Sequence, residues 1–135
     1  MFIETLPNGT QRHLAEIGRD PFFSPFYLAG GSAIALYLGH RRSVDLDFFT
    51  NKSFRHESIK RRLEKMDKLG IDLFDADTFL GFLGETKVSF FRLDSHLLFP
   101  HEVFSGAKIA NLKDLALMKT DAISRRGTKR DFIDL

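Results

Sequence analysis

The sequence predicts a single mixed α/β (α+β) domain over residues 1–135, in which a small mixed β-sheet is flanked by helices. Three observations lead to this prediction. The chain has 135 residues, which is the size of one domain. Hydrophobic residues make up 43% and charged residues 28%, close to the averages of globular domains. Runs with a helical period alternate along the chain with short runs that have the period of a strand.

Three elements are expected near the N-terminus. A helix over residues 8–18 places its apolar side chains on one side. The apolar run 26–29 stops at two glycines and predicts a short buried strand. A helix over residues 32–38 follows, with its N-cap at Gly31 or Ser32 and its end at the next glycine.

A second strand and a longer helix are expected next. Residues 44–49 alternate in polarity, so Val44 and every second residue after it are expected to face the core. Residues 55–69 carry apolar side chains at helical spacing, and Gly70 is expected to stop this helix.

A β-hairpin is expected in the second half of the chain. A strand over residues 71–74 precedes it, and the strand-like runs 79–83 and 87–93 flank a turn that begins at Gly84. Residues 94–108 are ambiguous and are interpreted as a loop.

The C-terminal part is expected to be helical. Asn111 can cap a helix that runs to Arg125, and Asp114 stands three residues after this cap, where it would complete a capping box. A further helical segment is expected to begin near Thr128.

Composition and charge exclude several classes of protein. Without cysteine there is no disulfide, no thiolate zinc site and no cysteine nucleophile. The net charge of +2 is too weak to indicate nucleic-acid binding by itself. Fifteen phenylalanines and no tryptophan favour a core packed by phenylalanine. No apolar run can span a membrane and no signal peptide is recognisable, so a cytoplasmic protein with no membrane partner is expected.

Asp45 and Asp47 are the first candidate site residues. Residues i and i+2 of a strand face the same way, so the two carboxylates stand side by side. Like charges this close disfavour joint ionisation, and a bound Mg²⁺ or Mn²⁺ removes that penalty. The motif is a candidate metal site; taken alone, it also fits two solvated acids on an exposed sheet face.

The turn Gly30-Gly31-Ser32 is the second candidate. Glycines allow a sharp turn and a close approach of phosphate, and the N–H groups of the following helix favour an anion. The Ser32 hydroxyl is a further candidate donor, although an ordinary strand–helix turn has the same pattern. Only a short helix separates this turn from the two acids, so both features can serve one triphosphate.

Lys119 is the third candidate, because its neighbours three and four residues away are apolar. A lysine within an apolar stripe either extends to solvent or meets an acid. Asp131 and Asp134 are candidate partners. The functional interpretation directs the ammonium group at a phosphate or at the two carboxylates.

Two stretches of the sequence resemble a known family. The first runs from Gly30-Gly31-Ser32 through His40-Arg41-Arg42-Ser43 to Asp45-Leu46-Asp47, and the second from Leu115-Ala116-Leu117-Met118-Lys119 to the end of the chain. Together they resemble the AbiEii/AbiGii-type nucleotidyltransferase toxins, which are related to the MenT-type toxins. These toxins belong to the DNA polymerase β-like nucleotidyltransferase superfamily.

This resemblance implies a nucleotidyltransferase (polymerase β-like) fold and metal-dependent transfer of a nucleotide from an NTP, with Mg²⁺ or Mn²⁺ as cofactor. It also implies an RNA acceptor, such as a tRNA 3′ end, and a cognate antitoxin as partner. The predicted catalytic residues are Asp45, Asp47, Lys119 and Asp131, the first two also as metal ligands. The predicted nucleotide-binding residues are Gly30, Gly31, Ser32, Arg41 and Ser43.

Two features depart from the superfamily pattern. A later strand often carries a third acid, but the matching position here holds Ser89, with Asp94 nearby as a candidate substitute. Relatives usually continue into a helical C-terminal part that this sequence lacks. Both features favour the alternative of a catalytically degenerate module that binds a nucleotide or a partner.

Two other enzyme classes also use an Asp-x-Asp motif. A haloacid-dehalogenase-like phosphatase is disfavoured because Phe48 follows the second acid, and a glycosyltransferase is disfavoured by the length of the chain.

Overall fold

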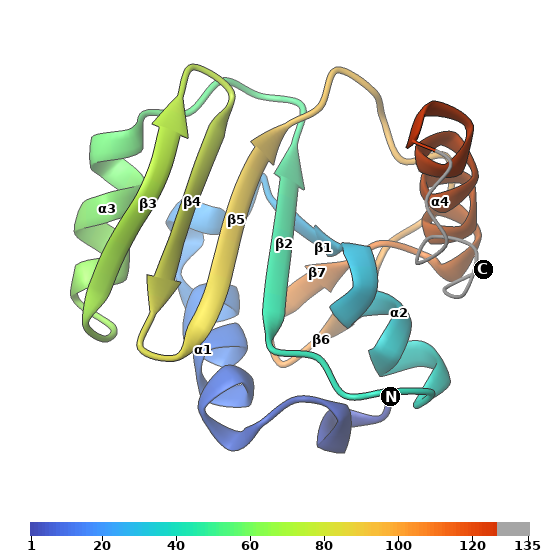
Figure 1. Ribbon diagram of the computed structural model, residues 1–135, viewed down its shortest axis with the longest axis horizontal. Coiled ribbons are helices and arrows are strands. Elements are labelled where there is room, and N and C mark those ends of the chain that lie inside the picture. The colour runs from blue at the N-terminus through green and yellow to red at the C-terminus, as the bar shows by residue number, and fades with distance from the viewer. Residues whose placement is uncertain (127–135) are drawn as a thin grey trace.

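The computed structural model describes residues 1–126, with side chains through residue 120 (Figure 1). The elements are two 3₁₀ turns, η1 (Ile3–Thr5) and η2 (Pro21–Phe23), the helices α1 (Asn8–Arg19), α2 (Gly30–Leu38), α3 (His56–Glu64) and α4 (Leu112–Arg126), and the strands β1 (Tyr27–Ala29), β2 (Asp45–Thr50), β3 (Leu69–Asp75), β4 (Thr78–Leu83), β5 (Thr86–Arg92), β6 (Glu102–Phe104) and β7 (Ala107–Ile109).

The strands form one mixed sheet in the order β3-β4-β5-β2-β1-β7-β6. The pairs β2–β5 and β1–β7 are parallel, and the other pairs are antiparallel. Helices α1 and α3 lie behind the sheet in Figure 1, while α2 and α4 lie beside its β1–β7 end. The predicted mixed α/β fold, with a sheet flanked by helices, is therefore confirmed.

Phenylalanine fills the core between the sheet and the helices behind it. The Phe90 ring is fully buried at the centre of a cluster. Its centroid lies 5.3 Å from that of Phe48, 5.4 Å from those of Phe23 and Phe26, and 6.1 Å from that of Phe79. Such ring pairs stabilise a core beyond the area that they bury. The expected phenylalanine-packed core is confirmed.

The opposite face of the sheet is partly open and carries Asp45 and Asp47. Alternation along β2 buries Leu46 and Phe48 on the helix-covered side and leaves the two acids half-buried on the other side. Val44, expected to face the core, is 49% exposed because the strand begins one residue later.

Three expected boundaries are wrong. Helix α2 begins at Gly30 and its N-cap residue is Ala29, so neither Gly31 nor Ser32 is the cap. Helix α3 ends at Glu64, and Gly70 lies inside β3, opposite Phe82 of β4. Met66 lies in the turn after the helix, and Leu69 begins β3, where it pairs with Leu83 of β4.

The segment 94–108 is not only a loop, because it contains the hairpin β6–β7. Its two turn residues, Ser105 and Gly106, both have positive φ, of 53° and 79°. Two residues with positive φ are the signature of a tight hairpin turn. Strand β7 then pairs with β1, and this pairing joins the C-terminal part to the sheet.

Asp114 does not complete a capping box. The Asn111 side chain accepts a hydrogen bond from the N–H of Lys113, as expected of a cap. Asp114 instead accepts hydrogen bonds from the N–H groups of Leu98 and Phe99, at 2.9 and 3.0 Å. It therefore fastens the 94–101 loop to the start of α4.

Within residues 1–126, the length and polarity of every helix are incompatible with a membrane span. The helical segment expected near Thr128, and with it Asp131 and Asp134, lies outside the described residues.

Candidate active site

The two acids of β2 stand on the open face of the sheet between strands β1 and β5. Asp45 is in register with Lys87 of β5, and Asp47 is in register with Ser89. On the other side, Asp47 is in register with Ala29, the last residue of β1. The acids therefore lie directly beside the point where β1 passes into helix α2.

Gly30 brings the turn against the carboxylate of Asp47. Its φ is +73°, a conformation that residues with a side chain rarely adopt. A Cβ atom on Gly30 would lie 2.5 Å from Oδ2 of Asp47. The first glycine of the turn is thus required both by its backbone conformation and by the acid packed on it.

The Asp47 carboxyl group is in an unfavourable environment for its own charge. Burial raises its pKa, and the neighbouring Asp45 raises it further. The Ser89 hydroxyl, which hydrogen-bonds Asp47, and the ammonium groups of Lys87 and Lys119 act in the opposite direction. Burial and Asp45 thus oppose the charge of Asp47, whereas Ser89 and the two lysines support it.

Ser32 links the start of α2 to the start of β2. Its side chain is fully buried, lies 2.7 Å from the Ser43 hydroxyl and donates to the backbone carbonyl of Asp45. The single hydroxyl proton of Ser32 is used in this bond. Ser32 and Ser43 therefore position the turn and the acid strand relative to each other, and their contact with a nucleotide stays a prediction.

Lys119 is half-buried on α4, which packs against α2, and its charge lowers the pKa of Asp47. The structure thus brings the turn against Asp47 and places both acids side by side, with the charge of Lys119 acting on Asp47. Arg41 is half-buried in the loop between α2 and β2. The predicted catalytic residue Asp131 lies outside the described residues.

No third carboxylate joins Asp45 and Asp47 at either of the two positions considered, Ser89 and Asp94. Ser89 occupies the position beside Asp47. Asp94 follows the end of β5, is exposed, and pairs with Arg92 at 3.1 Å. Among the side chains that the structure describes, residues 1–120, no group of three or more histidine or acidic side chains is arranged for a metal ion. Asp45 and Asp47 still fit Mg²⁺ or Mn²⁺, because both supply oxygen ligands and their mutual repulsion favours a cation.

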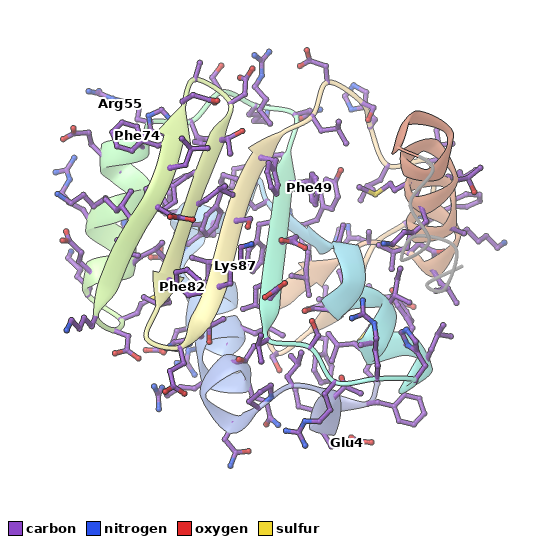
Figure 2. All side chains as sticks on the ribbon, in the orientation of Figure 1. Glu4, Phe49, Arg55, Phe74, Phe82 and Lys87 are labelled. Carbon is purple, nitrogen blue, oxygen red and sulfur yellow. The ribbon has the colours of Figure 1, made fainter. Side chains whose placement is uncertain are left out.

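Lys87 was missed by sequence reasoning. It stands beside Asp45 and contributes to the electrostatics of the acid pair. Figure 2 shows it on β5, the strand next to β2. The sequence contained enough information to find it. In a parallel pair of strands, pairing Asp47 with Ser89 also pairs the residues two positions earlier, Asp45 and Lys87.

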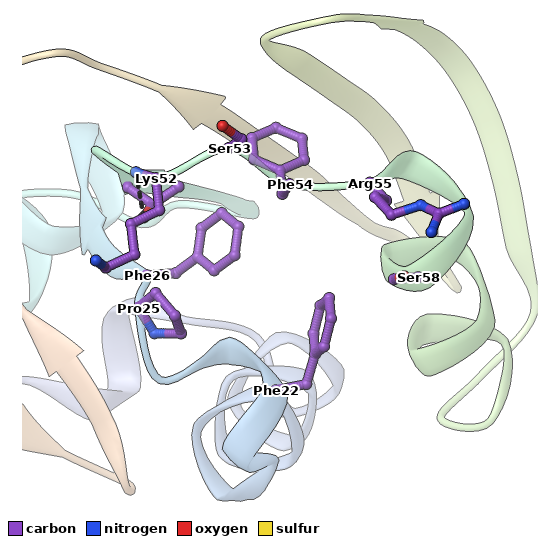
Figure 3. Close-up of a pocket in the computed structure, with 9 residues that line it drawn as sticks. Phe22, Pro25, Phe26, Lys52, Ser53, Phe54, Arg55 and Ser58 are labelled. Atoms are coloured by element: carbon purple, nitrogen blue, oxygen red, sulfur yellow. Dashed lines mark hydrogen bonds between the residues drawn. The ribbon is translucent and has the colours of Figure 1, made fainter.

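A cavity of about 280 Å³ lies apart from these residues, at the loop between β2 and α3. The rings of Phe22, Phe26 and Phe54 line it, with Lys52 and Arg55 at its rim (Figure 3). The charged ends of Lys52 and Arg55 point away from each other, to opposite sides of the opening. It contains no acid, so we do not assign the chemistry to it.

A second cavity, of about 240 Å³, opens beside Tyr27. Tyr27 is on the same face of the sheet as the acids, because it is in register with Phe49. One wall of this cavity therefore belongs to the sheet face that carries the acids.

Comparisons with known proteins agree with this arrangement. A family described as "Nucleotidyl transferase AbiEii toxin, Type IV TA system" matches residues 12–87, which include the turn, both acids and Lys87. The uncharacterized protein aq_aa25 of Aquifex aeolicus is 43% identical over 114 residues. The match covers 82% of this chain and 55% of that protein, so the chain spans about half the length of the curated relative.

Two solved structures share the fold. The crystal structure of JHP933 from Helicobacter pylori superposes with a TM-score of 0.65 at 19% identity, covering 96% of this chain and 66% of that one. The solution structure of the antibiotic-resistance factor ANT(2'')-Ia superposes with a TM-score of 0.62 at 16% identity, covering 89% and 75%. At these identities the likeness establishes a common fold.

Proposed function

Because the chain belongs to the AbiEii nucleotidyl transferase toxin family, we propose that it transfers a nucleotide from an NTP to an acceptor in a metal-dependent reaction. One observation carries the proposal. Asp47 packs against the glycine turn at the start of α2, and the charges of both Asp45 and Lys119 act on its carboxyl group. A triphosphate needs these three features together: ligands for a metal, N–H donors for its oxygens, and a cation for developing charge.

In the proposed site, Asp45 and Asp47 hold Mg²⁺ or Mn²⁺. A metal held there would supply positive charge against the phosphate oxygens of the NTP. The raised pKa of Asp47 is the physical reason for expecting a cation, because burial and Asp45 disfavour its ionised form.

The residues of the chain bind and orient the triphosphate. The N–H groups at the start of α2, from Gly30 and Gly31, bind the β- and γ-phosphates, and Lys119 balances negative charge at the α-phosphate. Arg41 and Ser43, from the loop before β2, are further nucleotide-binding candidates. Asp131 remains a proposed partner of Lys119.

The reaction itself is a displacement at the α-phosphorus. The acceptor hydroxyl oxygen forms a bond to the α-phosphorus. The bond between the α-phosphorus and the oxygen that bridges it to the β-phosphorus breaks, and pyrophosphate leaves with the electron pair. The hydroxyl proton passes to solvent, because Ser89 occupies the position beside Asp47 where an acid would accept it.

We propose RNA, such as a tRNA 3′ end, as the acceptor and an antitoxin as a protein partner. The support is the toxin–antitoxin description of the family, together with local basic clusters of the sequence, such as His40-Arg41-Arg42 and Lys60-Arg61-Arg62. Basic clusters bind phosphates without reading sequence.

A labelled-nucleotide assay tests the proposal. The protein is incubated with each α-labelled NTP, Mg²⁺ and total tRNA, and label on RNA is measured. The variant Asp47→Asn should lower the rate by a factor on the order of 10³. The matched control is Asp72→Asn, which changes an exposed acid on the edge strand β3. Absence of NTP binding, or transfer that Asp47→Asn leaves intact, would refute the proposal.

One observation favours the alternative of a degenerate binding module. Ser89 stands where a third acid is expected, and its hydroxyl is bonded to Asp47. Metal-dependent NTP binding without transfer to RNA or protein would support this alternative.

A further inference from the structure

The cavity beside Tyr27 is lined by groups that suit one nucleotide. Its walls include the Tyr27 ring and the polar side chains of Asn51, Ser95, His96, His101 and Lys108. At about 240 Å³ it is smaller than the 300–1,000 Å³ typical of sites for drug-sized ligands, so it fits one base rather than a complete NTP.

Three aromatic rings lead from the open sheet face to this cavity. Phe91, Phe49 and Tyr27 stand side by side on β5, β2 and β1. Their centroids are 5.2 Å and 6.0 Å apart and their planes are inclined by 29° and 22°, so the rings are stacked. Tyr27 ends the stack and borders the cavity. A flat ring placed in the cavity can extend this stack.

The polar lining complements a nucleotide. The Asn51 amide nitrogen lies 2.9 Å from Nδ1 of His96, and both side chains have hydrogen-bonding capacity left for a base edge. Lys108 donates one hydrogen bond to the carbonyl of Ser24. Among the side chains described, no carboxylate forms an ion pair with Lys108, so its charge is available to a phosphate.

The direction of the proposed reaction indicates whether the nucleotide in this cavity would belong to the NTP or to the acceptor. Attacking and leaving oxygens lie on opposite sides of the phosphorus. The turn at Gly30 follows the last residue of β1, and Tyr27 is the first residue of the same strand. Asp47 lies beside Ala29, at the turn end of the strand, and Phe49, two residues further along β2, lies beside Tyr27. If pyrophosphate leaves toward the turn, the acceptor must approach from the side of Tyr27.

We propose that the cavity beside Tyr27 seats the unpaired 3′-terminal nucleotide of the acceptor RNA, with its base stacked on the Tyr27 ring. The position is close enough for this role, because Phe49, in register with Tyr27, lies two residues along β2 from Asp47, about 6.6 Å. This inference rests on the proposed function for the direction of attack.

RNA binding measured without NTP tests it separately from transfer. Two fluorescein-labelled single-stranded RNAs are compared by anisotropy with the wild-type protein at low salt: one ends in adenosine, and the other has an abasic ribose at its 3′ end. Removing the base should weaken binding on the order of tenfold. An RNA with the abasic ribose at its 5′ end is the control and should bind like the intact RNA.

Substitutions locate the effect at Tyr27. Tyr27→Leu should bind the intact RNA as weakly as the wild type binds the abasic RNA, with no further loss for the abasic RNA. Tyr27→Phe should retain the affinity. Phe82→Leu is the matched control, because Phe82 is an exposed ring on the same sheet face, two strands from β2 (Figure 2). Lys108→Ala should weaken both RNAs equally, as loss of a phosphate contact does.

The outcomes separate the two proposals. Equal affinities for the intact and 3′-abasic RNAs, or no measurable binding of either, overturn this inference even when label transfer is observed. A tenfold base effect that disappears in Tyr27→Leu supports it, and this reading does not depend on turnover. Absence of NTP binding or of label transfer refutes the proposed function. The anisotropy result still decides whether the cavity binds a 3′-terminal base, because it is measured without NTP.

Discussion

The carboxylate of Asp47 packs against the α-carbon of Gly30. A Cβ atom at position 30 would lie only 2.5 Å from Oδ2 of Asp47. This contact sets the distance between the acid pair and the start of α2. In the proposed mechanism, it also sets the distance between the metal and the phosphate-binding turn.

Replacing Gly30 by alanine should therefore damage both the fold and the site. The positive φ alone should cost about 1–2 kcal/mol of unfolding free energy, and the clash should displace Asp47. Urea denaturation and the labelled-nucleotide assay measure the two effects. Gly9→Ala is the control, because nothing lies within 4 Å of its Cβ position; in helix α1 it should stabilise by about 0.5–1 kcal/mol. A Gly30→Ala protein with wild-type stability and transfer would contradict this account.

His13→Ala should destabilise the fold by about 1–3 kcal/mol, measured by urea denaturation. His13 is only 2% exposed and lies 2.7 Å from the Thr86 hydroxyl and 2.8 Å from Oδ2 of Asp67. It thus joins α1 to the β4–β5 turn and to the segment before β3, and its loss leaves Thr86 with one partner fewer. Arg12→Ala is the control: Arg12 also bonds Asp67 but is 61% exposed, so its loss should cost less than about 1 kcal/mol. Equal effects of the two substitutions would argue against a buried network.

Asp114→Ala should loosen the 94–101 loop. The substitution removes the carboxylate that accepts hydrogen bonds from the N–H groups of Leu98 and Phe99. These two hydrogen bonds are charge-assisted. Amide hydrogen exchange at these two positions should become faster, and unfolding free energy should fall by about 1–3 kcal/mol. Leu117→Ala, at an exposed position further along α4, should leave the exchange of both amides unchanged. Unaltered exchange in Asp114→Ala would show that other contacts hold the loop.

Tyr37 should titrate at high pH. Burial, with a further contribution from the charge of Glu102, raises its pKa from 10.0 to about 12, and its hydroxyl donates to the Ala110 carbonyl at 2.8 Å. Because the folded pKa is raised, this stabilisation is fully present below pH 10 and is lost as the pH rises toward 12. The chain has two tyrosines, so Tyr27→Phe isolates Tyr37 in a titration of phenolate absorbance. A midpoint near 10 in the folded protein would contradict the assignment; the same midpoint in urea is the expected control.

The strongest sequence signals were local ones. Alternation in residues 44–49 and the glycine at the β4–β5 turn predicted β2 and the hairpin, because these patterns depend on neighbouring residues alone. Strands β6 and β7 were missed because each has only three residues and, unlike β1, neither is an uninterrupted apolar run. The pairing partner of β7 is β1, near the other end of the chain, and no local pattern reveals this pairing.

The candidate site was predictable in its motifs but not in its contacts. Asp45, Asp47 and the glycine turn are visible as spaced residue types. The contact of Gly30 with Asp47, and the position of Lys87 beside Asp45, depend on strand register. The internal use of the Ser32 hydroxyl depends on how α2 is set against β2. Register and helix placement are tertiary properties, so residue types alone could not supply them.

The parallel pairing of Leu28 with Ile109 has a consequence for the order of folding. Strands β3, β4 and β5 are joined by tight turns, and short loops close quickly, whereas β7 must find β1 across most of the chain. We expect the docking of β7 to be a late event. Lys119 follows β7 in the chain. A folding intermediate in which β7 has not yet docked would therefore have the acid pair and the glycine turn in place, but not the amine of Lys119. Assembly of the centre is thus tied to the last stage of maturation.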